Sequence, residues 1–224
     1  MPSRKPKPAA GKRPLGKQAL QLRIALLEVK PEVWRRLVVP ADIRLDELHE
    51  VLQAAMGWFD CHLHLFHFAS AEYGVPDPDY PDQGEDERKK KLHQLVRVGD
   101  AFGYSYDFGD GWEHRVVVEA AVAREAHPRV PACLDGARRC PPEDVGGPWG
   151  YADFLEGYLK PKSKRRKELV EWIGRKFDPE RFDLDGINTN LRRVKAGRDP
   201  LLPDDDARWS EEEEEGGGGW VAAR

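Results

Sequence analysis

A tight turn between two alternating runs of residues constrains this chain more than any other feature. Gly109-Asp110-Gly111 separates the run Tyr104 to Phe108 from the run Glu113 to Val122, and both runs carry aromatic or β-branched residues at alternate positions. An Asp-Gly pair between two such runs is a strong short-range signal for a β-hairpin. The chain is therefore expected to build a sheet that is at least partly antiparallel.

Three more segments have the period of two that is typical of a half-buried strand. They are Gln18 to Val29, Val33 to Val39 and His62 to Ala69. The first two lie on either side of Lys30-Pro31-Glu32, which predicts a second hairpin. The segment Tyr73 to Lys91 is rich in Pro, Asp, Gly and charge, so we expect it to run over the surface.

Helical spacing of apolar residues marks other parts of the chain. Leu45 to Met56 predicts an amphipathic helix that ends at Gly57. Tyr151 to Tyr158 and Ser163 to Lys176 predict two more helices, and we expect the last to bury Leu169, Trp172, Ile173 and Phe177. The order of strands and helices predicts an α+β fold, with a largely antiparallel sheet and helices on one side of it.

The two ends of the chain have opposite charge. Residues 1–17 contain several prolines and the basic residues Arg4 to Lys17 without an acid, whereas residues 203–224 contain Asp204 to Asp206, Glu211 to Glu215 and four glycines. Such compositions bury too little apolar surface to fold alone, so both ends are expected to be disordered. This leaves a single domain at residues 18–195, and the basic arm is a candidate contact for nucleic acid.

Composition also restricts location and redox state. No apolar run approaches the length of a membrane helix, and the start of the sequence lacks a signal peptide, so we expect no membrane partner and a cytoplasmic location. Cys61, Cys133 and Cys140 leave one odd thiol and are expected to be reduced. The formal net charge of −4 argues against a strongly basic core for nucleic-acid binding.

The hairpin turn carries the first candidate site. Asp107, Asp110, Glu113 and His114 surround it, and their carboxylates and imidazole are groups that bind cations or exchange protons. With the acidic loop further along, the candidate polar site is Asp107, Asp110, Trp112, His114, Glu143 and Asp144. The alternative is that Asp107 and Asp110 only stabilise the turn while Trp112 packs in the core.

A second candidate is a zinc site. Six residues lie between Cys133 and Cys140, and His62 and His64 share one face of a predicted strand, so the four side chains are candidate zinc ligands. The alternative is that the two thiols pack as small apolar groups and the histidines form hydrogen bonds. Lys160 to Lys167 form a basic cluster at the start of the last predicted helix, which is a second candidate contact for nucleic acid or else a solvated face.

Four motifs then resemble a known family. They are Gly57-Trp58 with His62 to Phe66, Tyr104 to His114, Cys133 to Gly147, and Phe177 to Phe182. In this order they resemble the plasmid pRiA4b ORF-3-like family, whose members are often labelled transposon passengers or resolvase-like (TnpR-like) proteins. The resemblance implies an MM3350-like α+β fold and an association with plasmids and mobile elements, and it implies no established activity.

The resolvase label fails on chemistry. A serine recombinase needs an early nucleophilic serine and a tyrosine recombinase needs a His-x-x-Arg motif, but the early serine Ser3 lies in the predicted disordered arm and the motif is missing from the sequence. The leading hypothesis is an uncharacterised, non-enzymatic binding or accessory module. The alternative is a metal-dependent hydrolase of nucleic acid or of a small phosphorylated substrate, with Asp110, His114, Glu143 and Asp144 as its ligands or acid-base groups.

Overall fold

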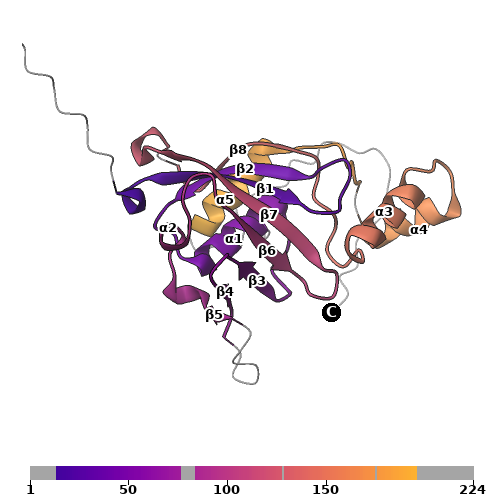
Figure 1. Cartoon of the computed structure of the whole chain (residues 1–224). Helices are drawn as coiled ribbons and strands as arrows, with labels where there is room; N and C mark the ends of the chain where they lie inside the picture. The colour runs from indigo at the N-terminus through magenta and orange to yellow at the C-terminus, as the bar shows by residue number, and fades with distance from the viewer. Residues whose placement is uncertain (1–13, 77–83, 128, 175, 196–224) are drawn as a thin grey trace, which may run out of the picture.

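The computed structural model describes residues 14–76, 84–127, 129–174 and 176–195. These residues form one eight-stranded sheet with the order β5-β4-β3-β6-β7-β1-β2-β8 (Figure 1). Neighbouring strands are antiparallel except β4 and β5, which are parallel. The predicted α+β class is confirmed. The strands are β1 Ala19–Leu26, β2 Trp34–Pro40, β3 His64–His67, β4 Glu72–Gly74, β5 Glu85–Asp86, β6 Ala101–Tyr106, β7 Trp112–Val122 and β8 Ala132–Ala137.

Both predicted hairpins are confirmed. β1 pairs with β2 through Leu22 and Leu37, and β6 pairs with β7 through Tyr106 and Trp112. β1 also pairs with β7, which is far away in the sequence, and so joins the two hairpins into one sheet. Local turn chemistry explains each hairpin, whereas their union depends on burial of the apolar face that they share.

Two helices cover that face. Helix α1, Leu45–Met56, buries Leu45, Leu48 and Leu52, and it ends at Gly57, whose φ of 85° is a left-handed conformation that favours glycine. Helix α5, Leu184–Lys195, packs against α1 and β8. Figure 1 shows α1 and α5 together against the sheet. The other face is polar over β2 and β7, where Arg36 is paired with Glu119.

Two further helices lie beyond one end of the sheet (Figure 1). They are α3, Gly147–Tyr158, and α4, Lys164–Ile173, which pack against each other. The prediction that the last of the expected helices buries Leu169, Trp172, Ile173 and Phe177 holds only in part, because Leu169 and Ile173 pack half-buried against the core while Trp172 does not. No residue of α4 is buried and Trp172 is half exposed, because α4 packs on α3 and lies away from the sheet. Phe177 is buried after the helix has ended.

Other differences from the predictions have tertiary causes. The expected surface excursion contains β4, β5 and the one-turn helix η2, Glu87–Lys89, and it buries Tyr73 and Glu87. Strand β8 forms in a stretch without strand periodicity because β2 offers it an edge. The remaining short elements are η1 Leu15–Lys17, α2 Leu92–Leu95 and η3 Arg124–Ala126.

The predicted acidic tail and residues 1–13 of the predicted basic arm lie outside the described residues, whereas the last part of that arm forms the helical turn η1. Within the described part of the chain, no helix is both long and apolar enough to cross a membrane.

Candidate functional site

Three loops meet at the end of the sheet near α3. They are the turn between β6 and β7, the loop from α1 to β3, and the loop that follows β8. The backbone N–H of Gly146 donates to Asp110 Oδ2 over 3.0 Å, the hydroxyl of Tyr106 donates to Glu143 Oε1 over 2.5 Å, and the backbone N–H of Cys61 donates to Tyr106 Oη over 3.2 Å. The first bond joins two loops and the other two join loops to the end of β6, so the sheet and its loops position one another.

A glycine permits the closest of these approaches. Gly147 has a φ of 68°, and a Cβ atom on it would lie 2.1 Å from the carbonyl oxygen of Asp110. No side chain fits at that distance. The hairpin turn and the start of α3 can therefore touch only because residue 147 is glycine.

The side chain of His62 lies at the centre of the three loops. Its Nε2 is 3.0 Å from Asp144 Oδ1 and 3.5 Å from Asp107 Oδ2. The ligand atoms of Cys61, His62 and Glu143 also lie within 4.8 Å of one another, as do those of His62, Asp107 and Asp144. The five residues Cys61, His62, Asp107, Glu143 and Asp144 are called the His62 cluster below.

Burial adjusts the acidity of the cluster. It raises the pKa of the Glu143 carboxyl above its ordinary value, although hydrogen bonds from Tyr106 and Cys61 oppose that shift. Burial and the neighbouring Glu143 also raise the pKa of the Cys61 thiol. One oxygen of Glu143, Oε2, is buried without a hydrogen-bond partner. A cation would offset both the burial of this carboxyl and its missing partner.

Asp107 is fixed by the turn that it begins. Its φ of 53° is left-handed, which Asp tolerates better than most residues. Its Oδ1 accepts hydrogen bonds from the backbone N–H groups of Gly109 and Asp110, at 3.0 and 3.3 Å. The other oxygen, Oδ2, is directed to His62. Asp107 therefore stabilises the turn and contributes to the His62 cluster at the same time.

Aromatic side chains form the floor beneath the cluster. Trp58 is buried, donates from Nε1 to the carbonyl of Pro141 over 3.0 Å, and stacks on Tyr106 with 5.1 Å between ring centroids. Trp112 and His114 contact the same indole. His114 is almost fully buried, and burial lowers its pKa to about 4. Trp112 and His114 of the predicted polar site thus belong to the core below it.

Several predicted site residues do not join the cluster. Glu113 points to the other face of β7, where its carboxylate accepts from Ser105 Oγ. His64 is buried, bonds to Glu87 Oε2 at 2.8 Å and stacks on His49. Because neither Cys133 nor Cys140 belongs to any group of three converging ligands in the described residues, the predicted set of these cysteines with His62 and His64 is not brought together.

The predicted basic cluster is partly neutralised by nearby acids. Lys160 is paired with Glu156 at 2.6 Å and Lys164 with Glu168 at 3.4 Å. Arg165 is paired with Asp153. These pairs are typical of a solvated helical surface, although the structure does not test contact with nucleic acid.

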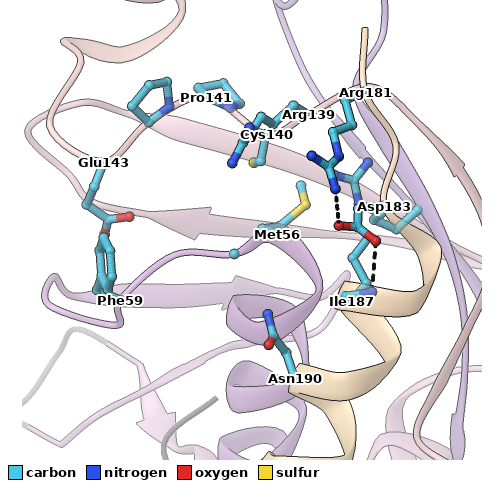
Figure 2. A pocket seen from close by; sticks show the side chains of 14 residues that line it. Met56, Phe59, Arg139, Cys140, Pro141, Glu143, Arg181, Asp183, Ile187 and Asn190 are labelled. Atoms are coloured by element: carbon cyan, nitrogen blue, oxygen red, sulfur yellow. Dashed lines mark hydrogen bonds and ion pairs between the residues drawn. The ribbon is translucent and has the colours of Figure 1, made fainter. Parts of the chain in front are cut away.

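Sequence reasoning missed two residues for which a signal existed. Cys61 precedes His62 directly, and thiolate and imidazole are both ligands that zinc takes in proteins. Arg35 takes a core-facing position in the alternation of Val33, Leu37 and Val39, where an apolar residue is expected. Arg35 and Glu143 line a pocket beside the cluster (Figure 2).

Comparisons with known proteins agree on the family level. The model of the family described as plasmid pRiA4b ORF-3-like protein matches residues 18–186. The uncharacterized protein y4hQ of Sinorhizobium fredii is 41% identical over 196 residues, which cover 85% of this chain and 94% of that protein. A crystal structure of MM3350 from Methanosarcina mazei Go1, a protein of unknown function, superposes with a TM-score of 0.69 at 33% identity and covers 75% of this chain and 96% of that one.

Proposed function

The chain belongs to the plasmid pRiA4b ORF-3-like protein family, and we propose that it acts as a non-enzymatic binding module whose binding centre is a metal ion in the His62 cluster. The proposal keeps the expected role as an accessory protein of plasmids and mobile elements. The support for that role is the family description alone, which refers to a plasmid reading frame. The support for the metal is geometric.

One observation carries the metal proposal. Side chains from two loops place a thiol, an imidazole and a carboxylate so close that their ligand atoms lie within 4.8 Å of one another. Ligands of a tetrahedral zinc ion, with metal-to-ligand distances of about 2.0–2.3 Å, lie about 3.3–3.8 Å apart. The separation of 3.4 Å between Cys61 Sγ and Glu143 Oε1 is in this range, and that of 3.0 Å between His62 Nε2 and Asp144 Oδ1 is a few tenths of an ångström shorter.

The kinds of ligand atom favour zinc. Sulfur, imidazole nitrogen and carboxylate oxygen are the three donors that zinc takes in proteins, whereas calcium and magnesium prefer oxygen alone. Cys61, His62 and Glu143 would occupy three of four positions, with Asp144 or a group of a binding partner at the fourth. Such a site links the loops to a partner without any reaction.

Two alternatives compete with this reading. The contacts of His62 with Asp107 and Asp144 are also sufficient, without a metal, to hold the three loops together. A metal-dependent hydrolase is the second alternative, but its proposed set included His114, which lies in the core below the cluster. The buried position of His114 favours the binding module.

The test is the metal content of the untagged full-length protein, followed by titration of the metal-free protein with Zn²⁺ and Co²⁺. We expect one bound ion per chain and, for Co²⁺, a thiolate-to-cobalt absorption band that Cys61→Ser abolishes. His62→Gln should weaken binding at least about tenfold, because even the loss of a group that only orients a ligand costs about 10–100-fold in metal affinity. A protein that binds neither ion would refute the proposal.

A matched control exists on the neighbouring strand. His67 is part-exposed and bonds to Glu72 and Ser105 outside the cluster. His67→Gln should therefore bind zinc as the unchanged protein does. An equal loss of zinc in His67→Gln and His62→Gln would show that the effect comes from altered folding, and the assignment of His62 as a ligand would be wrong.

A further inference from the structure

A pocket of about 280 Å³ lies between the end of α1, the loop after β8 and the start of α5. Figure 2 shows Arg139 and Cys140 above Met56, Glu143 with Phe59 to the left, and Arg181 with Asp183 to the right. Ligand pockets of about 300 Å³ hold small molecules only. The pocket is thus large enough for a small metabolite.

A buried guanidinium forms part of its wall. Arg35 is only 3% exposed, and it projects from β2 into the core. Its Nε donates to the carbonyl of Ala55 over 3.1 Å, and its Nη1 donates to those of Trp34 and Ala137 over 2.8 and 3.0 Å. These carbonyls belong to α1, β2 and β8, so Arg35 ties three elements together.

The charge of Arg35 is not neutralised by those contacts. Carbonyl groups are dipoles, and within the described residues Arg35 has no ion pair with a carboxylate. The acidic side chains that act on the charge of Arg35 are the thiols of Cys133 and Cys140. Burial raises the pKa of both thiols, and that of Cys140 to about 12. Both are therefore neutral thiols. A buried cation is normally paired with an anion.

Two more arginines line the same pocket, which adds to its positive charge. They are Arg139 and Arg181. Arg181 is paired with Asp183 at 3.0 Å, but Asp183 also accepts a hydrogen bond from the backbone N–H of Gly186 and so begins α5. Glu143 is the other carboxyl of the wall. The wall of the pocket thus holds three guanidinium groups and two carboxyl groups.

We infer that this pocket binds a small oxyanion, a carboxylate or a phosphate group of a small molecule, between Arg35, Arg139 and Arg181. Guanidinium groups bind both anions through paired N–H donors, and a site of low dielectric strengthens such bonds. The inference goes beyond the metal site, because it uses the arginines of the pocket and holds with or without a metal in the His62 cluster.

The experiment uses the full-length protein after removal of metal, so that failure of the metal proposal does not affect its result. Inorganic phosphate and succinate are titrated at constant ionic strength, with chloride as reference, by calorimetry and by thermal unfolding. We expect saturable binding of one anion per chain. A response to phosphate alone or to succinate alone identifies which oxyanion the pocket accepts.

Three variants locate the binding. Arg181→Gln and Arg139→Gln, at the edge of the pocket, should weaken anion binding about tenfold each, as loss of one charge-assisted bond does. Arg35→Met should abolish it, although this variant also loses three structural bonds. Arg88→Gln is the matched control, because Arg88 is exposed and is paired with Asp86 outside the pocket. Equal anion affinity in Arg181→Gln, Arg139→Gln and the unchanged protein, or no saturable binding at all, would overturn the inference.

Discussion

The buried histidine of the core makes the stability of this protein depend on pH. His114 is almost fully buried, its Nδ1 bonds to the carbonyl oxygen of Tyr104 at 3.0 Å, and its Nε2 is buried without a partner. A proton on Nε2 would place an unpaired charge in the core. Burial therefore lowers the pKa of His114 from 6.5 to about 4.

The sign and size of the effect follow from this shift. Above the unfolded pKa of 6.5, His114 is neutral in both states and contributes no pH dependence. As the pH falls below that value the unfolded chain binds a proton that the folded chain refuses, so stability is lost progressively until about pH 4. At about 1.4 kcal/mol for each pKa unit, the total loss is about 3 kcal/mol.

The assay is urea unfolding at about pH 7.5 and about pH 4.5, where the His114 contribution differs by about 2.5 kcal/mol. His114→Phe keeps an aromatic ring against Trp58 and removes the proton site. Between the two pH values, its free energy of unfolding should therefore change by about 2.5 kcal/mol less than that of the unchanged protein. Burial also lowers the pKa of His49, which adds loss of the same sign to both proteins. Burial raises the pKa of Glu143, which acts in the opposite direction in both.

The comparison therefore isolates His114. An NMR titration of the folded protein is an independent check, and it should show the imidazole of His114 neutral at about pH 5. If His114→Phe and the unchanged protein lost equal stability between the two pH values, or if His114 titrated above pH 6 in the folded state, the argument from burial would be refuted.

Two other predictions concern the loops. Gly147→Ala should destabilise the fold by at least about 2 kcal/mol in chemical denaturation, because its Cβ would meet the carbonyl oxygen of Asp110. Gly174 has nearly the same φ, 66°, but a Cβ there would have no atom within 4 Å. Gly174→Ala should therefore cost only about 1 kcal/mol. Equal costs would disprove the close approach. The double variant Cys133→Ser with Cys140→Ser should retain zinc, although its unfolding midpoint should be lower. Loss of the metal from a folded double variant would show that these cysteines are metal ligands.

The candidate site was predictable only in part. Asp107, Asp110, Glu143 and Asp144 were identified from sequence, because acidic residues at turns signal both turn chemistry and ligand chemistry, and they lie in the two loops that meet. The side chains of Trp112 and His114 were assigned to the same site, but they face the core. His114 shares one face of β7 with Trp112, Val116 and Val118, and this apolar alternation indicates a buried face, which the assignment to a polar site overlooked.

Local patterns in the sequence determined α1 and the two hairpins, because helical periodicity, a terminal glycine and an Asp-Gly turn act over a few neighbouring residues. Tertiary structure alone decided that β8 forms on the edge of β2, that α4 stays outside the core, and that Cys61 and His62 meet Glu143 and Asp144. Those outcomes depend on which surfaces far apart in the chain bury each other. The periodicity of a single segment carries no information about its distant partner, so the clusters that could bind a ligand become visible only in the folded chain.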